Sequence, residues 1–242
     1  MAAFLLEVYY IGNQKELLQE RNLEIGLDLK STSNDELAVV NNSGFLVCPH
    51  CGYSDLASGF QKTKVKSHKA PNGRECPNDL LHRRSIGHTF KTDVTTLSVN
   101  DYLPYEEAYS ILYSILEGLS KSLSIERNDV DGTVDYVFSH SGNSYTRFIL
   151  FDTVPGGAGH VRRLGKASEE DILHTFQASY AIVKDCNCDE DTACYSCIQN
   201  YRNQSRHDYL ERRHAVNFFE RIFYDVEKIK NVEQLKVTLK NE

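Results

Sequence analysis

Four closely spaced cysteines give this sequence its strongest chemical signal. They follow the pattern Cys-x-Cys-x5-Cys-x2-Cys, at Cys186, Cys188, Cys194 and Cys197. Zn²⁺ takes four soft ligands in a tetrahedron, with each sulfur at ~2.3 Å, and cysteine pairs at short spacing supply such ligands. Four thiolates close the coordination sphere and leave no position for a reactive water. The pattern therefore predicts a structural zinc site rather than a catalytic one.

The knuckle Cys48-Pro-His-Cys51-Gly is typical of a zinc ribbon and predicts a second zinc site. Cys76 is the only cysteine left to join it, so the fourth ligand must be one of four histidines: His50, His68, His82 or His88. We expect His68, which lies shortly before Cys76, with His82 as the second choice. The start of the chain lacks the features of a secretory signal, so seven cysteines favour reduced thiols in the cytoplasm.

A glycine-rich segment follows an apolar strand and has the sequence Asp152-Thr-Val-Pro-Gly-Gly-Ala-Gly-His160. The residues of interest in it are Asp152, Pro155, Gly156, Gly157, Gly159 and His160. Backbone N–H groups in such a loop can hold an anion, but the segment matches neither a Walker A motif nor a dinucleotide fingerprint. A tight turn that needs glycine at positive φ explains the same residues equally well. An acid–base pair of Asp152 and His160 is a further alternative.

The charge is distributed unevenly along the 242 residues. The net charge is −7, yet residues 61–91 contain eight Lys or Arg against two Asp or Glu. A local basic segment of this kind can bind phosphates in an acidic chain. The candidate phosphate contacts are Lys62, Lys64, Lys66, Lys69, Arg74, Arg83 and Arg84, and a solvated surface loop is the alternative. A second candidate basic surface comprises Arg162, Arg163, Arg202, Arg206, Arg212 and Arg213.

The pattern of apolar residues predicts an α+β fold. Its parts are a zinc-ribbon-like insert, a small mixed sheet with helices, and a helical end that is cross-linked by the four-cysteine zinc site. Strands are predicted at 4–10, 36–47, 92–99, 136–140 and 146–151, with a turn at Ser141–Ser144, and helices at 104–123, 168–184, 207–226 and 232–239. The predicted segments are N-terminal strands at 1–47, a basic insert at 48–91, and a core at 92–242.

Several classes of protein are excluded at this point. No apolar run approaches the ~20 residues of a membrane-spanning helix. The sequence also lacks the serine-hydrolase, zinc-protease and helicase motor motifs, so we expect no catalytic activity.

Three segments together resemble the MrfA-type zinc-binding (MZB) domain, found at the C-terminal end of superfamily-2 DNA helicases. They are Gly44–Gly52 with His68, Cys76 and Gly87–Val94, then Leu150–Gly159, then Cys186–Cys197 ahead of a helix. The resemblance spans about residues 36–225. It implies that the late four-cysteine group binds zinc, and that the domain is an accessory part of an ATP-dependent helicase in DNA repair or anti-phage defence.

These observations lead to one main hypothesis and two alternatives. The chain is expected to bind two zinc ions, to contact DNA, and to serve a superfamily-2 helicase whose motor is a separate subunit or a missing part of the same chain. The first alternative is an enzyme that acts on phosphodiesters or nucleotides at residues 152–160. The second is a docking module that never touches DNA.

Overall fold

The computed structural model describes residues 6–12, 16–42, 44–57, 67–138 and 144–240. They form two compact units. Unit 1 comprises Met1–Tyr9 and Leu37–Thr89, and unit 2 comprises Tyr10–Glu36 and Phe90–Glu242. The boundaries expected from composition, after residues 47 and 91, stay a prediction.

The main sheet has the strand order β1-β3-β9-β11-β10, and β2 pairs with β3. Its strands are β1 (Leu6–Tyr10), β2 (Leu17–Asn22), β3 (Leu27–Asn41), β9 (Gly87–Val99), β10 (Val130–Phe138) and β11 (Ser144–Asp152). The strand β11 is antiparallel to both neighbours, with Val130 opposite Asp152 on one side and Thr146 opposite Val99 on the other. The predicted α+β class is confirmed by this sheet and its helices.

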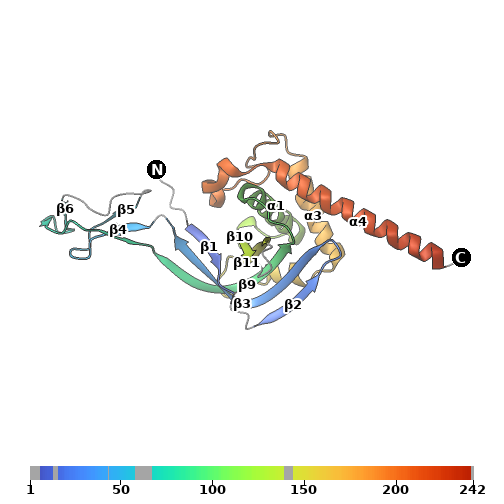
Figure 1. The fold of residues 1–242 in the computed structure, drawn as a ribbon, viewed down its shortest axis with the longest axis horizontal. Coiled ribbons are helices and arrows are strands. Elements are labelled where there is room, and N and C mark those ends of the chain that lie inside the picture. The colour runs from blue at the N-terminus through green and yellow to red at the C-terminus, as the bar shows by residue number, and fades with distance from the viewer. Residues whose placement is uncertain (1–5, 13–15, 43, 58–66, 139–143, 241–242) are drawn as a thin grey trace. The chain divides into compact units, whose positions relative to one another are not determined.

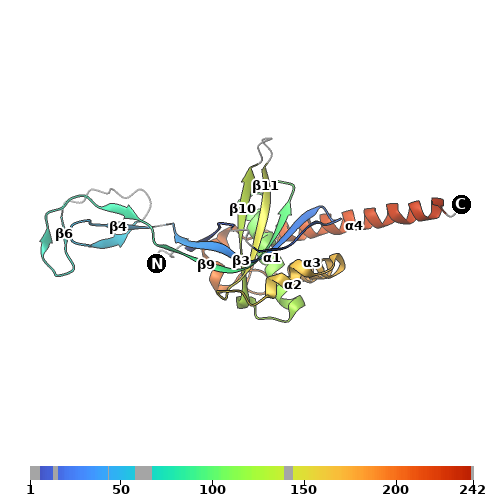
Figure 2. The ribbon, with the colours of Figure 1, turned by 90° about the horizontal axis from the view of Figure 1, so that it is seen from below.

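Helices cover one face of this sheet in unit 2 (Figures 1 and 2). They are α1 (Tyr105–Leu123), α2 (His160–Lys166), α3 (Glu169–Lys184) and α4 (Arg212–Lys240), with the 3-10 segments η1 (Arg127–Asp129) and η2 (Tyr201–Tyr209). The helix α1 packs against β10 and β11 and is itself contacted by α3 and α4. Phe148, Phe176 and Phe219 are fully buried between these layers. At the α1–α3 contact a Cβ on Gly118 would lie 2.0 Å from Ser179 Oγ, so the close approach requires glycine.

Unit 1 contains short strands and little apolar core. The strands β4 (Phe45–Val47), β5 (Ser54–Leu56) and β8 (His82–Arg84) form a small sheet, and β6 (His68–Lys69) pairs with β7 (Glu75–Cys76). Its described buried cluster is Leu46, Cys48, Ala57, Cys76 and Leu81. Two of these five residues are predicted metal ligands, so the packing of this segment depends on what those thiols bind.

The predicted elements differ from the observed ones in several places. The strand expected at 36–47 is divided between the end of β3 and β4, the strand expected at 92–99 begins at Gly87, and the helix α2 was not predicted. The helix expected at 207–226 begins at Arg212, because η2 occupies the residues before it. This helix, α4, continues to Lys240 and so includes the separate short helix expected at 232–239.

The polar stretch after residue 10 contains β2 and most of β3, which were not predicted. The strand β10 begins six residues earlier than expected, at Val130, and it includes Gly132, where a Cβ would lie 2.8 Å from Leu112 Cδ1 of α1. Of the turn predicted at Ser141–Ser144, residues 141–143 lie outside the described residues, and Ser144 is the first residue of β11.

Among the described residues, no helix combines the length and the apolar character needed to cross a membrane.

Candidate metal centres

The structure brings the four late cysteines together, and we call them the four-cysteine cluster. Their Sγ atoms are separated by 3.5 Å for Cys186 to Cys188, 3.5 Å for Cys186 to Cys194, and 3.9 Å for Cys197 to both Cys188 and Cys194. Four sulfurs at 2.3 Å from the centre of a tetrahedron would lie about 3.8 Å apart. The donor set and its spacing therefore fit Zn²⁺, which would be held by four thiolates with no open position.

Local hydrogen bonds favour the ionised form of part of this cluster. Burial opposes ionisation of Cys194, but the backbone N–H of Ser196 and the neighbouring thiols lower its pKa to about 7. The N–H of Cys194 in turn donates to Cys197 Sγ at 3.1 Å. Burial raises the pKa of the Cys188 and Cys197 thiols, so the thiolate, which is the form that binds a metal, is favoured at Cys194 in particular.

The four-cysteine cluster connects the end of α3 to the start of α4. Cys186 follows the α3 C-cap, Asp185, and the buried Arg212 at the start of α4 donates to the carbonyls of Cys188 (3.0 Å) and Val183 (3.1 Å). Between them, Arg206 of η2 lies 4.4 Å from the centre of the Tyr109 ring and donates to Tyr105 Oη at 2.8 Å. Two arginines thus attach the cysteine segment to α1 and α3.

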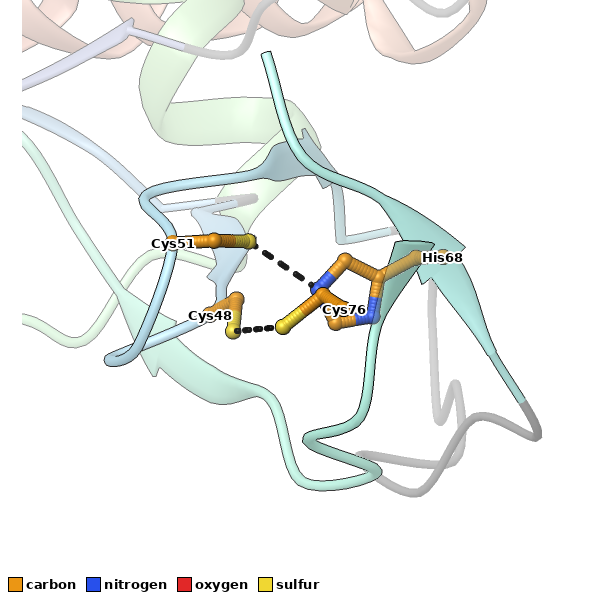
Figure 3. A group of neighbouring side chains, drawn as sticks. All are labelled: Cys48, Cys51, His68 and Cys76. Atoms are coloured by element: carbon orange, nitrogen blue, oxygen red, sulfur yellow. Dashed lines mark hydrogen bonds between the residues drawn. The ribbon is translucent and has the colours of Figure 1, made fainter. Parts of the chain in front are cut away.

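A second group, the cysteine–histidine cluster, comprises Cys48, Cys51, His68 and Cys76 (Figure 3). Its four ligand atoms lie within 4.8 Å of one another, with Cys48 Sγ 3.9 Å from Cys76 Sγ and Cys51 Sγ 3.2 Å from His68 Nε2. His82 lies on the exposed strand β8 and is not part of this group. The structure thus places the first-choice histidine, rather than the second, beside the three thiols.

In the cysteine–histidine cluster the thiolate is favoured at Cys48, whereas burial raises the pKa of the Cys51 thiol. Burial raises the pKa of the Cys48 thiol, but the Asn78 side-chain amide, at 3.3 Å, and backbone N–H groups outweigh burial and lower it to about 5. Cys48 and Cys76 are buried, so a charged thiolate there requires a counter-charge nearby. A bound Zn²⁺ ion would supply it.

The glycine-rich loop is closed by the protein's own carboxylates. The buried Asp152 accepts hydrogen bonds from the N–H groups of Ala158 (2.7 Å), His160 (3.0 Å) and Val161 (2.9 Å). Asp93 of β9 accepts from Gly159 N–H at 3.1 Å and pairs with Arg162 at 2.9 Å. The remaining N–H groups, of Gly156 and Gly157, donate to the carbonyls of Lys91 and Val154.

These hydrogen bonds distinguish a loop that binds an external anion from a tight turn that needs glycine. All six N–H groups from Gly156 to Val161 have partners within the chain, so none is left to cradle an external anion. Gly157 has φ +78, and a Cβ there would lie 2.3 Å from Asp93 Oδ2. Asp152 contacts His160 through the backbone N–H of that histidine. The segment is a tight joint between β11 and α2, and the phosphate-cradle alternative is wrong for the loop itself.

The predicted basic surfaces are only partly present. Lys69, Arg74, Arg83 and Arg84 lie exposed in unit 1, while Lys62, Lys64 and Lys66 fall outside the described residues. In the second set Arg206 and Arg212 are buried and serve as structural contacts, so their assignment to a surface is wrong. Arg162 pairs with Asp93, and Arg213 pairs with Asp191 and Glu211. Arg163 and Arg202 stay exposed.

Sequence patterns missed several of the residues that build these sites. Asp93 sits in the predicted strand 92–99 among Thr, Ser and aliphatic residues, and its partners, Gly159 and Arg162, lie more than sixty positions later. The only signal was a carboxylate in a predicted strand whose other residues are uncharged. Arg206 and Arg212 carried no signal that distinguishes a buried arginine from an exposed one.

Part of the chain matches a known protein family. Residues 111–198 match the family model described as the MrfA Zn-binding domain, MZB. The match covers about a third of the chain and marks this segment as similar to MZB domains. It contains the whole four-cysteine cluster, so the predicted resemblance is confirmed there, whereas the cysteine–histidine cluster lies outside the match.

Individual relatives are longer than this chain. The chain is 26% identical over 211 residues to Druantia protein DruE of Escherichia coli (strain UMEA 4076-1), a match that covers 76% of this chain and 11% of DruE. The DUF1998 helicase MrfA, crystallised with DNA, has 14% sequence identity and a TM-score of 0.47 over 90% of this chain and 25% of MrfA. A second MrfA crystal structure, with DNA and AMPPNP, gives a TM-score of 0.35 over 89% of this chain and 22% of MrfA. The chain therefore spans about a tenth of DruE and a quarter of MrfA.

The two candidate histidines can be separated by substitution. We expect His68→Ala to weaken zinc binding at the cysteine–histidine cluster by about tenfold or more, because one of four ligands is lost. His82→Ala should leave it unchanged. The measurement is the release of zinc to a chromogenic chelator, titrated for both variants. Equal zinc affinity in the two variants would overturn the ligand assignment.

The closed loop predicts a large effect of Asp152→Asn on stability. The amide leaves one acceptor oxygen for three N–H donors and turns an NH₂ group toward them, so we expect a loss of about 3 kcal/mol in the free energy of unfolding. Urea denaturation measures this loss. Asp225→Asn, an exposed change of the same chemistry, should stay within about 0.5 kcal/mol of the unsubstituted protein. Unchanged stability of Asp152→Asn would show that the carboxylate is not a structural part of the loop.

Proposed function

We propose that this chain is the zinc-stabilised accessory module of an ATP-dependent DNA helicase, that it holds DNA, and that it catalyses no reaction itself. One observation carries the proposal. The segment that matches the MZB model contains four cysteines, and their sulfurs are separated by the distances of a tetrahedral zinc site. The setting is DNA repair or phage defence, in the cytoplasm, where all seven cysteines can stay reduced and available to a metal ion.

The helicase motor would come from elsewhere. The family is named after MrfA, a helicase crystallised with DNA, and DruE is a Druantia protein. Because the chain spans 11% of DruE and 25% of MrfA, the motor would be a separate subunit or another part of a longer polypeptide.

Two zinc ions would stabilise two different parts of the chain. The four-cysteine cluster would hold one ion between α3 and α4, and the cysteine–histidine cluster would hold the other in unit 1. Both donor sets are closed, so the chemistry that zinc supplies is structural cross-linking, worth on the order of 10 kcal/mol in small zinc folds. The residues after each knuckle would then be held in fixed positions for contact with a partner.

The proposed DNA contact is the basic part of unit 1. The exposed residues Lys69, Arg74, Arg83 and Arg84 lie on its short strands and turns, and Lys62, Lys64 and Lys66 precede them in sequence. Such side chains neutralise phosphates without reading bases, so binding would be independent of sequence and sensitive to salt.

The structure favours neither alternative function. An enzyme that acts on phosphodiesters at the loop would need N–H groups or a carboxylate free to meet substrate, and Asp152 is fully buried with three N–H partners. A docking module without DNA contact is distinguished by the experiment below.

Binding of the zinc-loaded chain to labelled single- and double-stranded DNA tests the proposal. We expect micromolar affinity at low salt that falls steeply as salt rises, because each neutralised phosphate releases counterions. Arg74→Glu with Arg84→Glu should weaken binding and flatten the salt dependence. The matched control is Lys91→Glu with Lys228→Glu, which changes the net charge by the same amount. Fluorescence anisotropy across a salt series measures both effects.

No binding by the folded, zinc-loaded protein at low salt would contradict the DNA contact and favour the docking alternative. Equal loss in the two double variants would assign the binding to overall charge rather than to unit 1.

A further inference from the structure

A cavity of about 410 Å³ lies in unit 2 beside α1, α2 and α3. Its lining includes Ser122 and Leu123 at the end of α1, Arg163 and Lys166 of α2, and His174 of α3. Arg163 and Lys166 are three positions apart, so they project from the same side of α2. Three groups that carry or can gain positive charge therefore surround one hollow.

The positive charge at this cavity exceeds the negative charge, because Arg163 and Lys166 line it together with a single described carboxylate, that of Asp171. Most arginines of unit 2 pair with a carboxylate: Arg127, Arg147, Arg162, Arg212, Arg213 and Arg221. Among the described residues, no ion pair is found for Arg163 or Lys166, both of which are exposed. The Arg163 guanidinium donates a long hydrogen bond, 3.4 Å, to the carbonyl of Leu123.

Two further groups line the cavity, one carboxylate and one hydroxyl. The carboxylate of Asp171 is the only one in the described lining; its Oδ2 accepts from the Ser168 hydroxyl at 2.7 Å and the Ser168 N–H at 3.3 Å in the α3 cap, and its negative charge reduces the net charge of the lining. Ser122 Oγ is buried without a hydrogen-bond partner in the described structure. A buried hydroxyl without a partner is uncommon in a folded protein, and Ser122 is one of the residues that line the cavity.

We propose that this cavity, which we call the α1–α3 pocket, binds a phosphate group of a nucleic-acid backbone. Arg163 would supply the fork of N–H donors that matches phosphate oxygens, and Lys166 and His174 would add charge at the rim. The proposal rests on the proposed contact with DNA and extends it to unit 2. To the contact in the zinc-dependent segment of unit 1, the pocket would add a phosphate contact in the helical segment that matches the MZB model.

The test compares two double variants of the zinc-loaded full chain in binding to fluorescein-labelled dT20. Arg163→Gln with Lys166→Gln should weaken affinity by about tenfold and reduce the magnitude of the salt slope by about 1. The control, Lys91→Gln with Lys228→Gln, removes the same charge from exposed positions outside the pocket and should have a much smaller effect. All four side chains are exposed, so folding and zinc content are expected to be unchanged.

A direct readout locates the bound phosphate. The imidazole signals of His174, followed by NMR, should shift when dT20 is added and shift less in the pocket double variant. A shift with inorganic phosphate but not with dT20 would make the pocket a site for small anions and overturn the proposal. If dT20 binds equally to both double variants, the pocket is excluded while the contact in unit 1 stands. If the unsubstituted chain does not bind dT20, both proposals fail.

Discussion

Four cysteine sulfurs within 3.5–3.9 Å of their neighbours form the contact on which the end of this fold depends. The segment between α3 and α4 is mostly polar, and Cys197, Ile198 and Leu210 are its buried apolar residues. The burial of so few apolar side chains cannot offset the conformational entropy that the segment loses on folding. A metal ion bound by the sulfurs would fix it, and with it the positions of Arg206 and Arg212, which tie η2 and α4 to α1 and α3.

Hydrogen bonds and ion pairs distinguish the charged groups that stabilise the fold from those that we propose bind a ligand. The glycine-rich joint uses two buried carboxylates, Asp93 and Asp152, to occupy the N–H groups that an anion would otherwise bind. The joint therefore holds α2 firmly against the sheet, and the basic side chains of α2 divide accordingly. Arg162 pairs inward with Asp93, whereas Arg163 and Lys166 stay exposed at the α1–α3 pocket. A motif that looks like a ligand site in sequence thus positions a neighbouring surface.

The sequence predicted the elements whose signal is local. Cysteine spacing indicated both ligand sets because chelation by a short segment depends on few residues, and the periodicity of Leu112, Leu116 and Leu119 indicated α1 almost to the residue. It could not predict β3, where Asn34 at φ 56 interrupts the alternation of an otherwise long strand. Nor could it predict the pairing of Asp93 with Arg162 or the burial of Arg206. Those contacts form between elements far apart in sequence and depend on the packing itself.

The number of zinc ions bound per chain decides whether metal holds this fold together, and native mass spectrometry on protein purified without added metal measures it. We expect two ions in the unsubstituted chain and one in Cys194→Ser, with the remaining ion held by the cysteine–histidine cluster. Bound zinc in that variant at the level of the unsubstituted chain, or no zinc in either protein, would contradict this expectation. The helical end would then have to be held together by contacts other than metal ligation.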